Sequence, residues 1–171
     1  AVGFFNSYRT CVTSAELEAL ESAERITVLK RVPGWLVVVV GYAGACCLAL
    51  ACGFDHVSDD DYARVTIAQA FAHRPRIDPS GTSWLPFPFW TLGSAMALFG
   101  RSLTVARIAS ITFASVASLL PYLAMRIRGA TKLRALACVG FALLSPWSVW
   151  LGAATVPESF TASASAAAAI A

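Results

Sequence analysis

The feature that most constrains the fold of this chain is a stretch without charged residues from Pro33 to Phe54. About 20 apolar residues wound into a helix cross the hydrocarbon core of a bilayer, and a helix satisfies its own backbone polar groups there. The stretch therefore predicts a transmembrane helix over about 34–54. Directly after it comes the acidic segment Asp55-His56-Val57-Ser58-Asp59-Asp60-Asp61-Tyr62. Adjacent carboxylates repel one another, so we interpret this segment as a candidate site at the membrane surface.

The composition of the whole chain is that of a polytopic membrane protein. It is 57% hydrophobic and 13% charged, with a mean hydropathy of +0.65, whereas soluble domains carry about 25% charged residues. No basic patch with interleaved aromatic residues occurs, which argues against a nucleic-acid partner. The five cysteines lack the spacing of a zinc site or a CxxC motif, and we interpret them as apolar filler. The predicted fold class is all-α: a polytopic transmembrane helical bundle with an outer loop that bears juxtamembrane helices.

The charge pattern predicts the membrane topology. Four bases without an acid lie close together at Arg126, Arg128, Lys132 and Arg134, and the positive-inside rule places this short loop in the cytoplasm. Residues 1–33, with a helix expected at 13–31, are predicted to be cytoplasmic because three bases adjoin the first span. Residues 34–171 would form the N-terminal part of a transmembrane domain. Its spans are expected at about 34–54, 103–125, 135–154 and, as the start of another, 160–171. Because the chain lacks an initial Met and stops in an apolar stretch, we expect a fragment.

The outer loop, 55–102, is predicted to carry two helices. Ser58 followed by Asp61 fits a helix start, and Arg74-Pro75 ends the helix, which predicts a helix at about 59–73. The second, at about 85–99, is apolar and rich in aromatic residues. Since only one crossing can separate the outer loop from the basic loop, we expect 85–99 to lie in the interface or to form a re-entrant hairpin.

The aspartate triplet Asp59, Asp60 and Asp61 has two interpretations. Acids in the first turn of a helix complement the helix dipole by about 0.3–1 kcal/mol each, so the triplet could serve only as a helix cap. However, successive side chains point about 100° apart on a helix, so the three cannot all face one side. A carboxylate held between water and an apolar wall suits a general base, which is the functional interpretation.

Glu158 and Arg107 are the other charged candidates. Glu158 lies at the outer end of a predicted span, where an acid is either a site residue or a loop residue that reaches water. Arg107 lies just inside a predicted span and would either snorkel to the interface or bind a phosphate with its planar guanidinium. His56 and His73 are more typical of surface positions. The aromatic residues from Trp84 to Trp90 are more typical of membrane anchoring than of a sugar platform.

The order of these features resembles the GT-C class of membrane glycosyltransferases. That class includes protein O-mannosyltransferases, lipid A aminoarabinose transferases and mycobacterial arabinosyltransferases. The resemblance covers about residues 34–171. Its motifs are Asp59-Asp60-Asp61-Tyr62-Ala63-Arg64, Leu85-Pro86, Leu98-Phe99-Gly100, Arg107 and Pro157-Glu158.

The resemblance implies an activity and a set of site residues. The leading acid of the outer loop is catalytic in that class, which corresponds to Asp59, with Asp60 second. Asp61, Tyr62, Arg107 and Glu158 would bind substrate. The donor would be a sugar on a polyprenyl phosphate, and the acceptor a lipid, a glycan or a protein. Asp59 and Asp60 would hold Mg²⁺ or Mn²⁺ if a divalent ion is used. The location would be a membrane, with the bacterial inner membrane favoured over the endoplasmic reticulum.

Two other functions fit the same residues. In a transporter or channel subunit, the acids and Arg107 would line a pathway, and broken helices would meet at the membrane midplane. In a non-catalytic membrane scaffold, the acids would be solvated helix caps.

Overall fold

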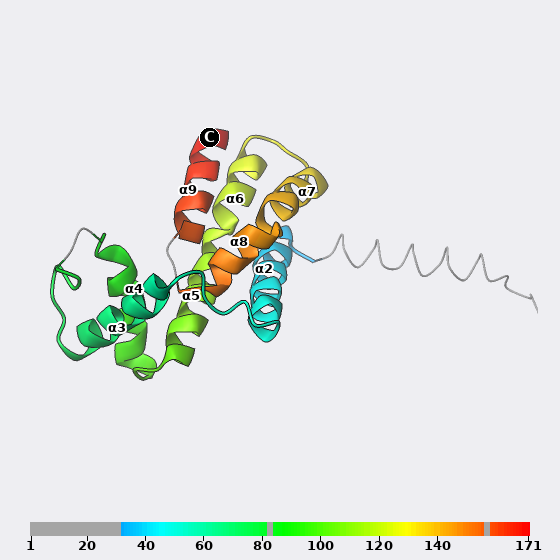
Figure 1. Ribbon diagram of the computed structural model, residues 1–171. Coiled ribbons are helices and arrows are strands. Elements are labelled where there is room, and N and C mark those ends of the chain that lie inside the picture. Colours follow the sequence, from blue (N-terminus) through cyan, green and yellow to red (C-terminus); the bar gives the residue numbers. More distant parts are fainter. Residues whose placement is uncertain (1–31, 82–83, 156–157) are drawn as a thin grey trace, which may run out of the picture. The chain divides into compact units, whose positions relative to one another are not determined.

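The computed structural model describes residues 32–81, 84–155 and 158–171, and this part of the chain is helical without strands (Figure 1). Backbone contacts divide the chain into residues 1–33 and 34–171. The helix predicted at 13–31 lies outside the described residues. The helices of the second unit are α2 (Gly34–Ala51), α3 (Asp59–His73), α4 (Phe87–Phe99), α5 (Leu103–Ala117), α6 (Leu119–Ile127), α7 (Lys132–Leu143), α8 (Pro146–Ala153) and α9 (Glu158–Ile170).

Two stretches of helix are long and apolar enough to cross a membrane. One is α2, with 18 residues, and the other is the 25-residue stretch Leu103–Ile127, which joins α5 to α6. A third crossing is counted if the bent pair of α7 and α8 is one span. By contrast, the 13 residues of α4 extend only about 20 Å, against about 30 Å of hydrocarbon. The all-α prediction is confirmed, whereas the polytopic bundle remains a prediction.

A proline interrupts the helix that α5 and α6 share. Pro121 has no N–H, so the carbonyl of Ala117 loses the partner that it would have in a regular helix. One residue after Ala117, the hydroxyl of Ser118 donates a 2.6 Å hydrogen bond to the carbonyl of Ser115. The interruption is local, because the helix axis continues well enough for Leu103–Ile127 to count as one stretch.

The chain bends by 73° between α7 and α8. The sequence predicted a continuous span over about 135–154, and the structure instead ends one helix at Leu143 and starts the next at Pro146. Ser145 caps the new helix, since its hydroxyl accepts a 3.4 Å hydrogen bond from the N–H of Ser148. Pro146 occupies the first helical position, where a missing N–H does no harm. A serine and a proline in an apolar run thus turn the chain.

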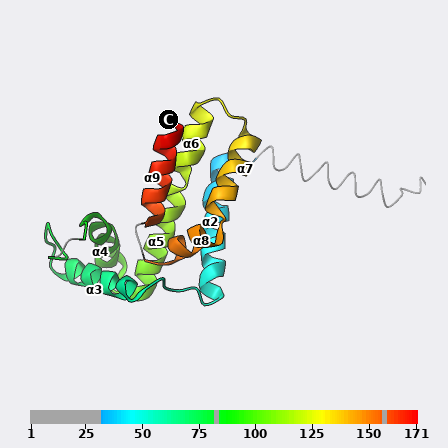
Figure 2. The same ribbon diagram turned by 45° about the horizontal axis from the view of Figure 1, so that its top comes forward.

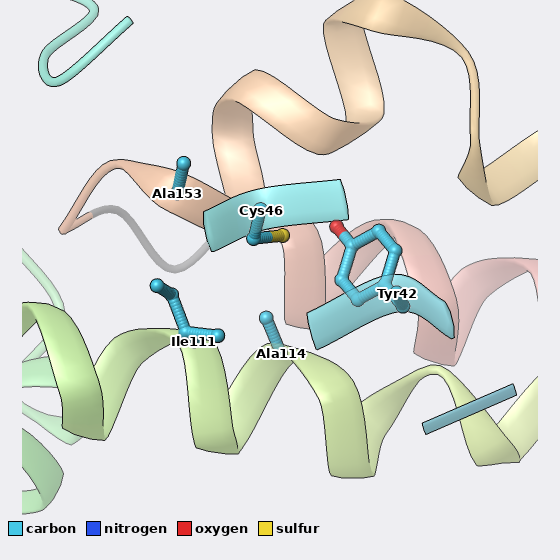
Figure 3. Packing of buried hydrophobic residues seen from close by; sticks show 5 residues of the cluster. All are labelled: Tyr42, Cys46, Ile111, Ala114 and Ala153. Carbon is cyan, nitrogen blue, oxygen red and sulfur yellow. The ribbon is translucent and has the colours of Figure 1, made fainter. Parts of the chain in front are cut away.

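Side chains from α2 hold the bent segment in place. The hydroxyl of Tyr42 donates a 2.8 Å hydrogen bond to the carbonyl of Ser148, and the Cys46 thiol lies 3.6 Å from the carbonyl of Val149. Gly152 permits this close approach, because a Cβ there would overlap the Tyr42 hydroxyl. Figure 3 shows Tyr42 and Cys46 beside Ala153, with Ile111 and Ala114 of α5 completing the cluster.

Helices α3 and α4 pack together beside α5 (Figures 1 and 2). Their shared core contains Val65 and Ala68 of α3, Leu92 and Met96 of α4, and Ala106 of α5. Gly93 allows the two helices to approach closely, because a Cβ there would meet the ring of Phe71. This unit fixes the place of the acidic first turn of α3 relative to the candidate span that begins at Leu103.

Candidate functional site

The three aspartates at the start of α3 have different environments. Asp59 and Asp60 are exposed, whereas Asp61 is only 3% exposed. The carboxylate of Asp61 accepts hydrogen bonds from the N–H groups of Val57, at 2.6 Å, and Ser58, at 3.3 Å. It therefore caps the loop before the helix, which satisfies backbone donors at the helix start. Asp59 and Asp60 are the two acids of the triplet that the structure leaves open to water.

Arg64 joins the start of α3 to the start of α9. Its Nη2 donates a 3.3 Å hydrogen bond to Oε1 of Glu158. Its Nη1 lies 3.9 Å from Oδ1 of Asp61, and the guanidinium lies 5.4 Å from the centre of the Trp84 ring. The Arg64 side chain is 17% exposed. Glu158, predicted as a substrate-binding residue, is thus brought to the same place as Asp61 by an arginine to which the sequence analysis gave no role.

Arg107, the predicted phosphate ligand, is paired with Asp55 rather than with the triplet. Its Nη2 donates to Oδ2 of Asp55 at 3.0 Å and to the carbonyl of the same residue at 3.3 Å. His56 Nδ1 lies 2.8 Å from the other carboxylate oxygen of Asp55. The hydrogen bond from His56, followed by the hydrogen bond and charge of Arg107, holds the pKa of the Asp55 carboxyl below its usual value. Asp55 is therefore a carboxylate at neutral pH.

Helix α8 and the segment after it are hydrogen-bonded to the acidic loop and to α5. The hydroxyl of Thr155 donates to the carbonyl of Asp61 at 3.3 Å, and that of Ser110 donates to the carbonyl of Ala154 at 2.9 Å. The indole N–H of Trp150 donates to the carbonyl of His56 at 2.9 Å. Tyr62 is exposed, and its ring lies 5.7 Å from that of His56. Two of these bonds connect the acidic segment to α8 and to the residues that follow α8.

An apolar groove of about 610 Å³ runs between α4 and α5. Phe87, Leu92 and Phe99 line it from α4, while Ile108, Phe113 and Val116 line it from α5. The rings of Phe87 and Phe113, both in the lining, and the ring of Phe160 contact one another in tilted arrangements with centroids 5.0–5.7 Å apart. Thr155 also lines the groove, and because Thr155 contacts Asp61, the groove adjoins the acidic turn. The sequence analysis did not predict this groove.

Sequence reasoning gave no individual role to Asp55, Arg64 or Thr155, although Asp55 lies in the acidic segment and Arg64 in the motif that follows it. Arg64 follows the triplet at helical spacing, so a partner three residues away was a signal that could have been read. The pairing of Arg64 with Glu158, and that of Arg107 with Asp55, spans 94 and 52 residues respectively. Such pairs follow from tertiary packing, and spacing along the chain does not indicate them.

Among the described residues, no three His, Cys, Asp or Glu side chains converge in a way that could hold a metal ion. The exposed pair Asp59 and Asp60 alone does not make the oxygen-rich cage that Mg²⁺ or Mn²⁺ prefers. Comparison with known proteins adds no assignment, since no family model, curated protein or solved structure matches the chain.

Proposed function

We propose that the protein is an integral-membrane glycosyltransferase that uses a sugar linked to a polyprenyl phosphate. The observation that carries the proposal is the junction of two unlike surfaces. The exposed carboxylates of Asp59 and Asp60 begin α3, and the apolar groove between α4 and α5 adjoins the same turn through Thr155. A substrate with a polar reacting group on a long hydrocarbon chain needs both surfaces side by side. The order of motifs that resembles the GT-C class supports the same substrate.

The proposed reaction is a single inverting displacement. The carboxylate of Asp59, or of Asp60 beside it, removes the proton from an acceptor hydroxyl. The hydroxyl oxygen then forms a bond to C1 of the sugar, while the bond from C1 to the phosphate oxygen breaks. The electron pair of the broken bond stays on the polyprenyl phosphate, and the proton stays on the aspartate. Negative charge thus develops on the leaving phosphate, where a fixed cation stabilises the transition state.

Arg107 is the cation that we propose for the leaving phosphate. Both of its hydrogen bonds to Asp55 use Nη2. A guanidinium carries five N–H donors, so Nε and Nη1 leave further donors for an anion. Asp55 would orient Arg107, and Glu158, Asp61 and Tyr62 would shape the same end of the site. The acceptor would be a lipid, a glycan or a protein on the non-cytoplasmic side of a membrane, with the bacterial inner membrane favoured.

The groove would receive the isoprenoid chain of the donor. Its lining is mostly apolar along α5 from Val105 to Val116, with Ser110 and Thr112 as the polar residues, and it lies within the stretch that is long enough to cross a membrane. Hydrocarbon buried there would contact aromatic and branched side chains. Each Å² of apolar surface removed from water would contribute about 25 cal/mol of favourable free energy. In a bilayer the gain over lipid is smaller, so the groove would select chain shape more than it would supply affinity.

The test of the proposal is transfer of a radiolabelled sugar from a polyprenyl phosphate in membranes that contain the protein. We expect Asp59→Asn to lower the transfer rate by at least a hundredfold, and Asp60→Asn to lower it less. Asp78→Asn is the matched control, because Asp78 is an exposed acid of the same outer loop. Full activity of both Asp59→Asn and Asp60→Asn in correctly inserted protein would refute the proposed base.

A transporter is the second candidate, and the 73° bend between α7 and α8 is the observation that favours it. Broken helices are typical of transporter binding sites. A flux assay in proteoliposomes separates the two functions, because a transporter moves solute without bond cleavage.

If the protein is instead a non-catalytic membrane scaffold, neutralising all three aspartates should leave its function intact.

A further inference from the structure

The end of α3 that lies away from the acids carries a basic and apolar surface. Arg74 and Arg76 are exposed, and Ile77 beside them is 88% exposed. Within the described ranges, no ion pair is formed by either arginine. A single exposed aliphatic side chain is ordinary, but exposed apolar residues that form a patch rimmed by polar groups mark an interaction site.

Trp90 fixes this surface to α4. Its indole N–H donates a 3.1 Å hydrogen bond to the carbonyl of Ile77, and its ring remains partly exposed. Nearby in the chain, Leu85 is 78% exposed. Helix α4 contains no charged residue, so the side chains around Trp90 continue the apolar character of Ile77. Tryptophan with one polar edge and one apolar body is the residue that prefers the headgroup level of a bilayer.

The charges of α3 are separated along its length. Asp59 and Asp60 are exposed in its first turn, whereas His73, Arg74 and Arg76 lie at or just beyond its last turn. Fifteen residues extend about 22 Å as a helix, which is more than the screening length of about 8–10 Å at physiological salt. A negatively charged bilayer surface therefore attracts one end of α3 and repels the other almost independently.

The nearest acid in the chain, Asp78, has another role. Its Oδ1 accepts hydrogen bonds from the hydroxyl of Ser80, at 3.2 Å, and from the N–H of Gly81, at 3.1 Å. The carboxylate thus closes the turn that follows Ile77. This leaves the two guanidinium groups available to an anion from outside the chain.

We propose that Arg74, Arg76, Ile77 and Trp90 form a binding surface for anionic phospholipid. The two arginines bind the headgroup phosphates, and Ile77 and Trp90 insert at the level where the acyl chains begin. This inference goes beyond the proposed glycosyl transfer and does not depend on it. If the surface binds lipid in this way, the C-terminal end of α3 contacts the bilayer while its acidic N-terminal end stays in water.

The experiment places the protein in nanodiscs that contain phosphatidylcholine and phosphatidylglycerol, with one of the two lipids brominated at a time. Bromine quenches a nearby indole, and the Trp90 component is the difference between the protein and its Trp90→Phe variant. We expect brominated phosphatidylglycerol to quench Trp90 more strongly than brominated phosphatidylcholine at equal mole fraction. This preference should decrease about fivefold for each arginine removed in Arg74→Gln and Arg76→Gln, and it should vanish in 0.5 M NaCl.

The matched control is Lys132→Gln with Arg134→Gln, which removes two bases from the first turn of α7, beyond the far end of the stretch Leu103–Ile127, and should leave the preference unchanged. Equal quenching by the two brominated lipids would overturn the proposal, as would a preference that survives loss of both arginines. Inorganic phosphate added at constant ionic strength should not compete. If it abolishes the preference, the arginines bind a free phosphate and the assignment to a lipid is wrong.

Discussion

Arg64 donates a 3.3 Å hydrogen bond to Glu158 and so joins α3 to α9 across 94 residues of sequence. The same guanidinium faces Oδ1 of Asp61, a buried oxygen without a hydrogen-bond partner, at 3.9 Å. Arg64 therefore compensates a buried carboxylate on one side and holds an exposed one on the other. The two carboxylates should respond very differently when their partner is changed.

The first prediction compares two variants of this contact. Arg64→Met should destabilise the protein by about 1–3 kcal/mol, because it removes the cation that faces the buried Oδ1 of Asp61. Glu158→Gln should change stability by less than about 1 kcal/mol, because the Glu158 side chain is 48% exposed and exposed ion pairs contribute little. Chemical unfolding in a mild detergent measures both. Equal losses would show that the pair with Asp61 does not matter.

The second prediction concerns the pairing of Asp55. Its pKa is lowered in the folded protein by the hydrogen bond from His56 and by Arg107, so its pairing stabilises the fold above the usual carboxyl pKa of about 3.9. That contribution is lost as the pH falls through the lower, folded pKa. The stability difference between the protein and Asp55→Asn should therefore shrink as the pH falls below 4. A difference that grows below pH 4 would contradict the pairing.

A third prediction tests the close approach of α2 and α8. Gly152→Ala would place a Cβ against the Tyr42 hydroxyl and 2.9 Å from the Cys46 sulfur, and we expect a loss of about 1–3 kcal/mol from overpacking. Gly140→Ala is the control, because nothing lies within 4 Å of a Cβ there. It should be neutral or slightly stabilising. Tyr42→Phe combined with Gly152→Ala should recover part of the loss, and a strictly additive pair would argue against the contact.

The fourth prediction tests the apolar groove as the site of the isoprenoid chain. Ala109→Phe adds a ring to the lining of the groove and should raise the KM for a long-chain donor about tenfold. A donor with a short chain should be affected much less, because it does not reach the filled part. Ala97→Phe, at an exposed position of α4 outside the groove, should leave both values unchanged. Equal effects on both donors would mean that the chain binds elsewhere.

Local sequence patterns predicted the position of α3 well. Ser58 before the helix and Pro75 after it bound a helix from Asp59 to His73, as expected. The bend before Pro146 was not predicted, because the hydrophobicity of 135–154 favoured an unbroken span. Ser145-Pro146 was the available sign of a new helix start. Hydrophobicity reports that a segment is apolar, and it does not report whether the segment is straight.

The candidate site was only partly predictable, because charge pairing depends on which helices meet. The triplet could be recognised as unusual, but the burial of Asp61 and the hydrogen bond from Thr155 to its carbonyl depend on segments far away in the sequence. Likewise, the sequence showed that Arg107 lies just inside a predicted span, but it did not show that Asp55 is its partner. The assignment of a glycosyl-transfer role to Asp59, Asp60 and Arg107 stays a prediction that the experiments above decide.

The bond from Thr155 to Asp61 has a consequence for biosynthesis. Chains emerge from the ribosome N-terminus first, and early segments fold before later ones are made. Helices α3 and α4 share a core, so this hairpin can form while the segment carrying Thr155 and Glu158 is still being synthesised. Only the arrival of that segment supplies the Thr155 hydroxyl that donates to the Asp61 carbonyl and the Glu158 carboxylate that accepts from Arg64. The acidic turn is thus among the last parts of this region to gain its full set of contacts.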